Sequence, residues 1–117
     1  MARAVVTIPA ALSSGASAGS SFRDLLLDSG YCLFSRAITV GMLEGALREH
    51  PEQVENWLAW SDNKRTDSGW YFRRRGLGGV EVGYFPFRAD RPSISFSEKE
   101  IFRACAQFIK FEIDDIC

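Results

Sequence analysis

Residues 70–75 combine two residue types that bind nucleic acids, an aromatic run followed by three consecutive arginines. Aromatic rings that stack on bases, flanked by guanidinium groups, are how several RNA-binding folds use a sheet surface. In a strand, however, alternate side chains point to opposite faces, so the even-numbered residues are expected on one face and the odd-numbered residues on the other. The run therefore also fits a hairpin whose rings lie in the core and whose arginines gather at its exposed end.

The other residue types that catalyse reactions form no recognisable motif. His50, the single histidine, precedes Pro51 at a predicted helix end, where an imidazole also suits the helix dipole. Residues 76–79 match neither a phosphate-binding loop nor a dinucleotide fingerprint, and they join two predicted strands. Asp114 and Asp115 are neighbours on a predicted helix, so their carboxylates do not converge. We therefore predict that the protein is not an enzyme and has no catalytic residues, no cofactor and no metal site.

The cysteines Cys32, Cys105 and Cys117 are widely spaced and contain no C-x-x-C pair. An odd number at this spacing is not a disulfide framework and is typical of a reducing compartment. Cys105 lies in an apolar helical stretch and is expected in the core, whereas Cys117 is expected to be an exposed thiol. One histidine leaves a His/Cys zinc site short of ligands. These observations predict a cytoplasmic protein.

The elements that position these residues must belong to one domain, because 117 residues is the size of a single core. A hydrophobic content of 46% and a charged content of 25% indicate a soluble globular chain and exclude a disordered one. We expect residues 1–20 to form a flexible or weakly structured segment and residues 21–117 to form a single α+β domain. The apolar run at 4–12 also resembles a signal peptide, and residues 3–8 fit a short strand. No apolar run is long enough to span a bilayer.

Helical spacing of apolar residues predicts three helices in the first half of the chain. A capping box at Ser21 precedes a helix that ends at Gly30. A second helix covers residues 39–49 and a third covers residues 51–60, with a proline in its first turn. Residues 31–38 fit either a strand or an extended link.

A β section comes next, and then a last helix. Residues 69–75 and 80–85 are aromatic and β-branched runs around a glycine-rich loop, which predicts a hairpin, and residues 93–96 predict a third strand. Ser97-x-x-Glu100 is a capping box that begins a helix over 98–116, whose apolar stripe centres on Ile109. The expected fold is therefore α+β, a small antiparallel sheet of about three strands packed against several helices, including a long C-terminal helix.

Charge is distributed unevenly along the chain. Residues 62–92 carry seven basic and four acidic groups, a net of +3, whereas residues 1–61 and 93–117 each sum to −2. The total of −1 argues against a nucleic-acid binder that relies on bulk charge. A dipolar, aromatic-rich domain with few catalytic options favours a protein-binding module, and neither a membrane nor a nucleic acid is expected as partner.

The candidate partner-binding residues are carboxylates of the third helix and of the polar segment after it, together with two tryptophans. The carboxylates are expected to offer an acidic face to a basic partner, and tryptophans often anchor interfaces. The set is Glu52, Glu55, Trp60, Asp62, Asp67 and Trp70. The simpler interpretations are a solvated helix face for the carboxylates and core packing for the tryptophans.

Four hydrophobic segments resemble those of a known protein family: SGWYF at 68–72, VGYFP at 82–86, SFS at 95–97 and ACAQFIKFEI at 104–113. They are similar to small bacterial immunity proteins of contact-dependent growth inhibition and related polymorphic toxin systems, over roughly residues 22–116. The resemblance implies a cytoplasmic toxin inhibitor that binds the toxic C-terminal domain of a cognate effector, commonly a nuclease, and blocks its active site or substrate path. Interface residues in this family vary from pair to pair, so the resemblance assigns none here. The alternative is a small RNA- or protein-binding regulatory domain that uses residues 70–75.

Overall fold

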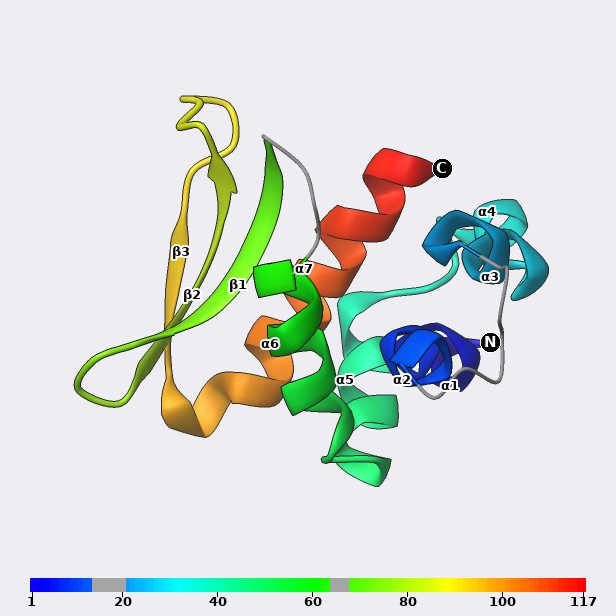
Figure 1. Ribbon diagram of the computed structural model, residues 1–117, viewed down its shortest axis with the longest axis horizontal. Helices are drawn as coiled ribbons and strands as arrows, with labels where there is room; N and C mark the ends of the chain where they lie inside the picture. The colour runs from blue at the N-terminus through cyan, green and yellow to red at the C-terminus, as the bar shows by residue number, and fades with distance from the viewer. Residues whose placement is uncertain (14–20, 64–67) are drawn as a thin grey trace.

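The computed structural model describes residues 1–13, 21–63 and 68–117. Its elements form an α+β fold in which the described helices gather on one side of a sheet (Figure 1). In chain order they are α1 (Ala2–Val6), α2 (Ile8–Ser13), α3 (Phe22–Asp28), α4 (Tyr31–Phe34), α5 (Val40–Glu49), α6 (Gln53–Asn63), β1 (Gly69–Arg75), β2 (Gly79–Phe85), β3 (Ile94–Ser97), the 3₁₀ turn η1 (Glu98–Glu100) and α7 (Ile101–Ile116). The predicted fold class is confirmed.

The sheet is an antiparallel meander in the order β1-β2-β3. The predicted hairpin is confirmed, with Trp70 opposite Tyr84 and Phe72 opposite Val82 across β1 and β2. β3 pairs with the other side of β2, where Phe96 lies opposite Val80. Because side chains that face each other across two strands lie on the same face, these residues form the inner, helix-facing side of the sheet.

Helix α7 lies between the sheet and the helices of the first half of the chain (Figure 1). Its predicted apolar stripe is buried, and both Phe108 and Ile109 are fully inaccessible. The predicted capping box is present, and the Ser97 amide donates to Oε1 of Glu100 at 3.1 Å. This hydrogen bond holds the pKa of the Glu100 carboxyl below its usual range. The box starts the η1 turn, and α7 continues directly from it.

The N-terminal residues contribute to the core, which corrects the expectation of a flexible or weakly structured segment at 1–20. Helices α1 and α2 bury Val5, Val6 and Ile8 completely or nearly so. The Trp57 indole donates to the carbonyl of Val6 at 2.9 Å, so α6 holds the end of α1 in place. The strand expected at 3–8 is also wrong, because these residues are helical. The remainder of that segment, 14–20, lies outside the described residues.

Helix α4 lies at the start of residues 31–38, where a strand or an extended link was expected. Hydrogen bonds join it to the C-terminal part of α7. The Tyr31 hydroxyl donates to Oδ1 of Asp114 at 2.7 Å and accepts from Nζ of Lys110 at 2.6 Å. Burial and the neighbouring Asp114 carboxylate raise the pKa of Tyr31 well above its usual value, so the phenol stays a proton donor.

A disulfide joins Cys32 of α4 to Cys117, with a Cα–Cα distance of 5.4 Å. The expectation of an exposed Cys117 thiol and of no disulfide is therefore wrong. The two residues are 85 positions apart, and the sequence contains no pattern that reports their proximity. The third cysteine, Cys105, is buried as expected, and burial raises the pKa of its thiol.

Ile109 tests the packing of α7. We expect Ile109→Ala to lower the free energy of unfolding by about 2–5 kcal/mol, because it leaves a cavity in a fully buried part of the core. Urea unfolding followed by circular dichroism measures this loss. The exposed Lys99→Ala is the control and is expected to stay within about 0.5 kcal/mol of the parent protein. Equal unfolding midpoints for both variants would contradict this description of the core.

The disulfide is expected to contribute about 2–4 kcal/mol, because it restrains a long loop of the unfolded chain. The double variant Cys32→Ala/Cys117→Ala is compared with the parent protein in urea, with and without dithiothreitol. The reductant should lower the midpoint of the parent protein to that of the variant and leave the variant unchanged. If the reductant leaves the unfolding midpoint of the parent protein unchanged, the two cysteines are not bonded in solution.

Candidate functional site

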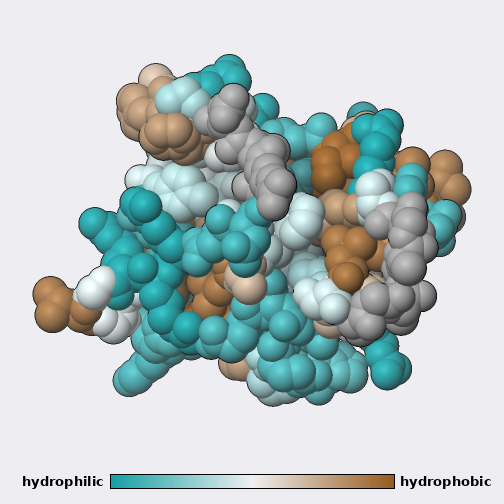
Figure 2. All heavy atoms as spheres, in the orientation of Figure 1, coloured by the Kyte–Doolittle hydropathy of each residue, from teal (hydrophilic) through white to brown (hydrophobic). Residues whose placement is uncertain are grey.

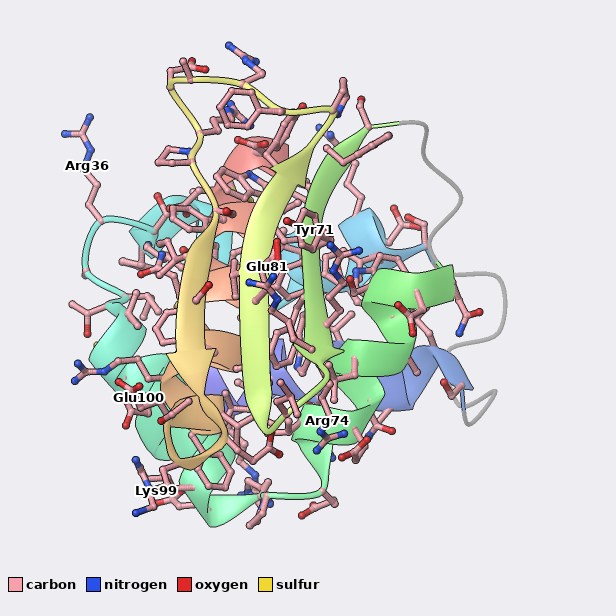
Figure 3. The ribbon with its side chains drawn as sticks, turned by 90° about the vertical axis from the view of Figure 1, so that its left-hand side faces the viewer. Arg36, Tyr71, Arg74, Glu81, Lys99 and Glu100 are labelled. Carbon is pink, nitrogen blue, oxygen red and sulfur yellow. A yellow bond between two sulfur atoms is a disulfide. The ribbon has the colours of Figure 1, made fainter. Side chains whose placement is uncertain are left out.

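The face of the sheet turned away from the helices carries a polar cluster that no described helix covers (Figure 3). We call this side of the sheet the open sheet face. Alternation places on it Tyr71, Arg73 and Arg75 of β1, Glu81 and Phe85 of β2, and Ser95 of β3. The predicted alternation of residues 70–75 is confirmed, because Trp70 and Phe72 are buried on the inner side.

Glu81 lies at the centre of the open sheet face and is nevertheless only 7% exposed. Its carboxylate accepts a short hydrogen bond from the Tyr71 hydroxyl. Two guanidinium groups flank it, Nη2 of Arg73 at 3.8 Å and Nε of Arg75 at 3.4 Å. Burial, followed by the hydrogen bond to Glu81, raises the pKa of Tyr71. One hydrogen bond and two ion pairs thus hold the Glu81 carboxylate, which is how a charge remains buried on a solvent-facing sheet.

Gly83 allows the Tyr71 ring to lie flat across the neighbouring strand. The two residues are paired in the register of β1 and β2, and a Cβ atom at position 83 would lie 2.6 Å from Cζ of Tyr71. That distance is shorter than real Cβ contacts, so any side chain here displaces the ring. The absence of a side chain at Gly83 therefore positions the tyrosine hydroxyl over Glu81.

Two of the predicted acidic residues, Glu55 and Asp62, are exposed on the same side of α6. Glu52 is also exposed and immediately precedes the helix. A hollow of about 560 Å³ separates this side from β1, and Glu55, Asp62, Arg73 and Arg74 line it together with Leu58 and Ala59. The hollow therefore has carboxylates on one wall and guanidinium groups on the other.

One ion pair spans this hollow. Nη2 of Arg74 lies 2.8 Å from Oε1 of Glu55, and Nε of Arg74 lies 3.3 Å from Oε1 of Glu98. The contact with Arg74 lowers the pKa of Glu55. Glu52 is more weakly paired, since its carboxylate lies 3.8 Å from Nδ1 of His50.

The predicted tryptophans face the interior. Trp70 is 6% exposed, stacks on Phe111 at 4.1 Å, and donates its indole hydrogen to Asp115. Trp60 is half-buried and stacks on Phe22 at 4.6 Å. Trp70 therefore belongs to the core, whereas Trp60 is partly exposed and lines a surface pocket between α2 and α6. Asp67, the remaining candidate, lies outside the described residues.

Two exposed aromatic residues were missed by sequence reasoning. Phe85 and Phe87 are 63% and 80% exposed and lie at the connection between β2 and β3. Figure 2 shows hydrophobic atoms at this upper end of the sheet. The signal in the sequence was the Phe-Pro-Phe triplet, because a proline ends the strand and leaves the flanking rings without a core to enter.

The described residues offer little to nucleic-acid or metal chemistry. The rings at 70 and 72 are inside, so the RNA-binding interpretation of 70–75 loses two of its three stacking surfaces. Within the same ranges, no group of three or more His, Cys, Asp or Glu side chains is arranged to hold a metal ion. No described helix is both long enough and apolar enough to cross a bilayer. The chain matches no family model, no curated protein and no solved structure in the comparisons with known proteins.

The Tyr71–Gly83 contact is testable by a double-mutant cycle. We expect Gly83→Ala to cost about 1–3 kcal/mol of unfolding free energy, because the new methyl group displaces the ring. In a Tyr71→Ala background the same change should cost less, with a coupling of at least about 0.5 kcal/mol. Urea unfolding of the four proteins gives both values. Additive costs would show that the ring does not lie over Gly83.

Proposed function

We propose that this protein is an immunity protein that binds the toxin domain of a bacterial effector and neutralises it by covering its active site or substrate path. The resemblance of residues 22–116 to immunity proteins of contact-dependent growth inhibition systems suggests this class. The observation that carries the proposal is that Glu55 and Asp62 share one exposed side of α6 and line the hollow at β1, with the exposed Glu52 just before the helix. Inhibition of this kind needs a binding surface and no catalytic group.

The acidic side of α6 suits a partner whose own surface is basic. Opposite charges steer two proteins together and raise the association rate, and the effect weakens as salt increases. A nuclease domain must attract phosphate groups, so its substrate path is a basic surface of the required kind. A basic side chain of the toxin that enters the hollow would compete with Arg74 for Glu55, which already has a partner there.

The compartment is part of the same proposal, because an inhibitor must meet the toxin where the toxin acts. We propose the cytoplasm. The Cys32–Cys117 disulfide weighs against this compartment, because disulfides persist mainly in oxidising environments. In a reducing cytoplasm the pair would be present as two thiols, and trapping free thiols in living cells with a membrane-permeable alkylating reagent distinguishes the two states.

Charge reversal tests the acidic face while leaving both members of the Glu55–Arg74 ion pair unsubstituted. We expect Glu52→Lys/Asp62→Lys to slow association with the toxin domain encoded beside this chain by about tenfold at low salt, with a smaller effect on dissociation. Stopped-flow or surface plasmon resonance measures the rates. Cells that express the toxin domain should survive with the parent protein and die with this variant.

The matched control is Asp28→Lys/Glu49→Lys, which changes the net charge equally at two other exposed positions. We expect its association rate to stay within about threefold of the parent rate. Equal slowing in both variants would mean that association depends only on total charge. It would contradict the proposal that the acidic side of α6 binds the toxin. Failure of the parent protein to bind or protect would contradict the immunity function itself. Urea midpoints of both variants confirm that they are folded.

A further inference from the structure

The open sheet face carries more positive charge than its own carboxylate neutralises. The side chains of Arg73 and Arg75 are 61% and 56% exposed, whereas that of Glu81 is 10% exposed. Among the described residues, Glu81 is the only acidic group within ion-pair distance of either arginine. Its carboxylate also accepts a hydrogen bond from Tyr71, so one carboxylate serves a hydroxyl and two cations. The face is left with a net charge of +1 and with guanidinium N–H groups that Glu81 does not use.

Both guanidinium groups are held in place by neighbours on the sheet itself. The central carbon of the Arg73 guanidinium lies 4.8 Å from the centre of the Tyr71 ring, a cation–π contact. Nη1 of Arg75 lies 3.4 Å from the hydroxyl oxygen of Ser95 on β3. Side chains that are already ordered lose less conformational entropy when a ligand binds. The two arginines are therefore prepared to bind an anionic group.

An apolar contact surface lies on the same face at a defined distance. Phe85 is 63% exposed and is paired with Gly69, while Glu81 is paired with Arg73. These two pairs are four strand positions apart, which corresponds to roughly 13 Å. An extended chain that places a carboxylate at the arginines therefore places a side chain four residues away near Phe85.

The ring geometry favours an acidic protein segment over a nucleic acid as the occupant. Single-stranded nucleic acids bind sheets by stacking bases on free ring faces. Trp70 stacks on Phe111 instead, Phe72 is fully buried, and the Tyr71 ring already has a guanidinium group on it, which leaves the exposed Phe85 as the ring that the open sheet face offers to a base. A carboxylate needs only paired N–H donors, and arginine provides them in the required geometry.

We propose that the open sheet face binds an extended acidic segment of a protein partner. One carboxylate of this segment pairs with Arg73 and Arg75, and an apolar side chain four residues away packs on Phe85. Arg73 also lines the hollow beside α6, whereas Arg75 and Phe85 do not, and the proposal does not depend on the immunity function.

The probe is a fluorescein-labelled peptide of sequence LSTSEE, with LSTSKK as its charge-reversed counterpart, at a salt concentration of about 20 mM to limit screening. We expect saturable binding of LSTSEE to the parent protein by fluorescence anisotropy, and no binding of LSTSKK. Arg73→Gln/Arg75→Gln should weaken binding by about tenfold or more, as expected for the loss of charge-assisted hydrogen bonds. Phe85→Ser should weaken it by about threefold or more, through loss of the apolar contact.

The matched control is Arg23→Gln/Arg36→Gln, which removes the same charge from two exposed arginines of the helical side, and should stay within about twofold. Equal weakening of LSTSEE binding in the control variant would show that binding depends only on net charge, and would overturn the proposal. Absence of LSTSEE binding to the parent protein would also overturn it. Tighter binding of hexauridylate than of LSTSEE, lost in Arg73→Gln/Arg75→Gln, would assign the face to nucleic acid instead. All variants keep the α6 carboxylates, and Phe85→Ser changes no residue of the hollow beside α6, so its result is independent of the toxin-binding test.

Discussion

The burial of α7 against the inner side of the sheet and against the helices of the first half determines where the candidate surfaces lie. Phe108 illustrates this constraint, because its ring packs edge-on against Trp57 of α6 at 6.1 Å and stacks on Phe72 of β1 at 5.8 Å. The small residues Ala104 and Cys105 are fully buried nearby on α7 and permit close approach of the neighbouring elements. This ring, together with the hydrogen bond from the Phe72 amide to the Ser61 hydroxyl, sets the position of α6 against β1 and of the hollow between their charged side chains.

One-sided packing also explains why a buried carboxylate occurs on a face that no described helix covers. Antiparallel sheets commonly pack one face on the core and leave the other to solvent. Here the outward side chains are long enough to cover part of that face themselves. Tyr71 crosses Gly83, the two flanking arginines close over the strand, and Glu81 becomes almost inaccessible beneath them. The hydrogen bond from Tyr71 and the two ion pairs to Glu81 thus form within the sheet, without help from a second layer.

Much of this arrangement follows from local sequence rules, and the exceptions have physical reasons. The capping box at Ser97 and the period of α7 are local signals, and the alternation of residues 70–75 needs only a strand. The helices at Ala2–Val6 and Ile8–Ser13 were missed because a short apolar run fits a strand as well as a helix, and Pro9 lies in the first turn of α2, where it is tolerated. Pairing of distant cysteines and burial of Trp70 depend on tertiary packing, which spacing along the chain does not encode.

The disulfide between Cys32 and Cys117 divides the chain into two mechanically different parts. The covalent ring that it closes contains α5, α6, the sheet and α7, and α1 to α3 lie outside it on the N-terminal side. A pulling force applied to the two ends of an oxidised molecule would extend the N-terminal part while the ring stays closed. The 85-residue separation corresponds to a contour length of roughly 290 Å that becomes available only after reduction. The redox state of one bond thus determines how much of the protein can be stretched or threaded through a narrow pore.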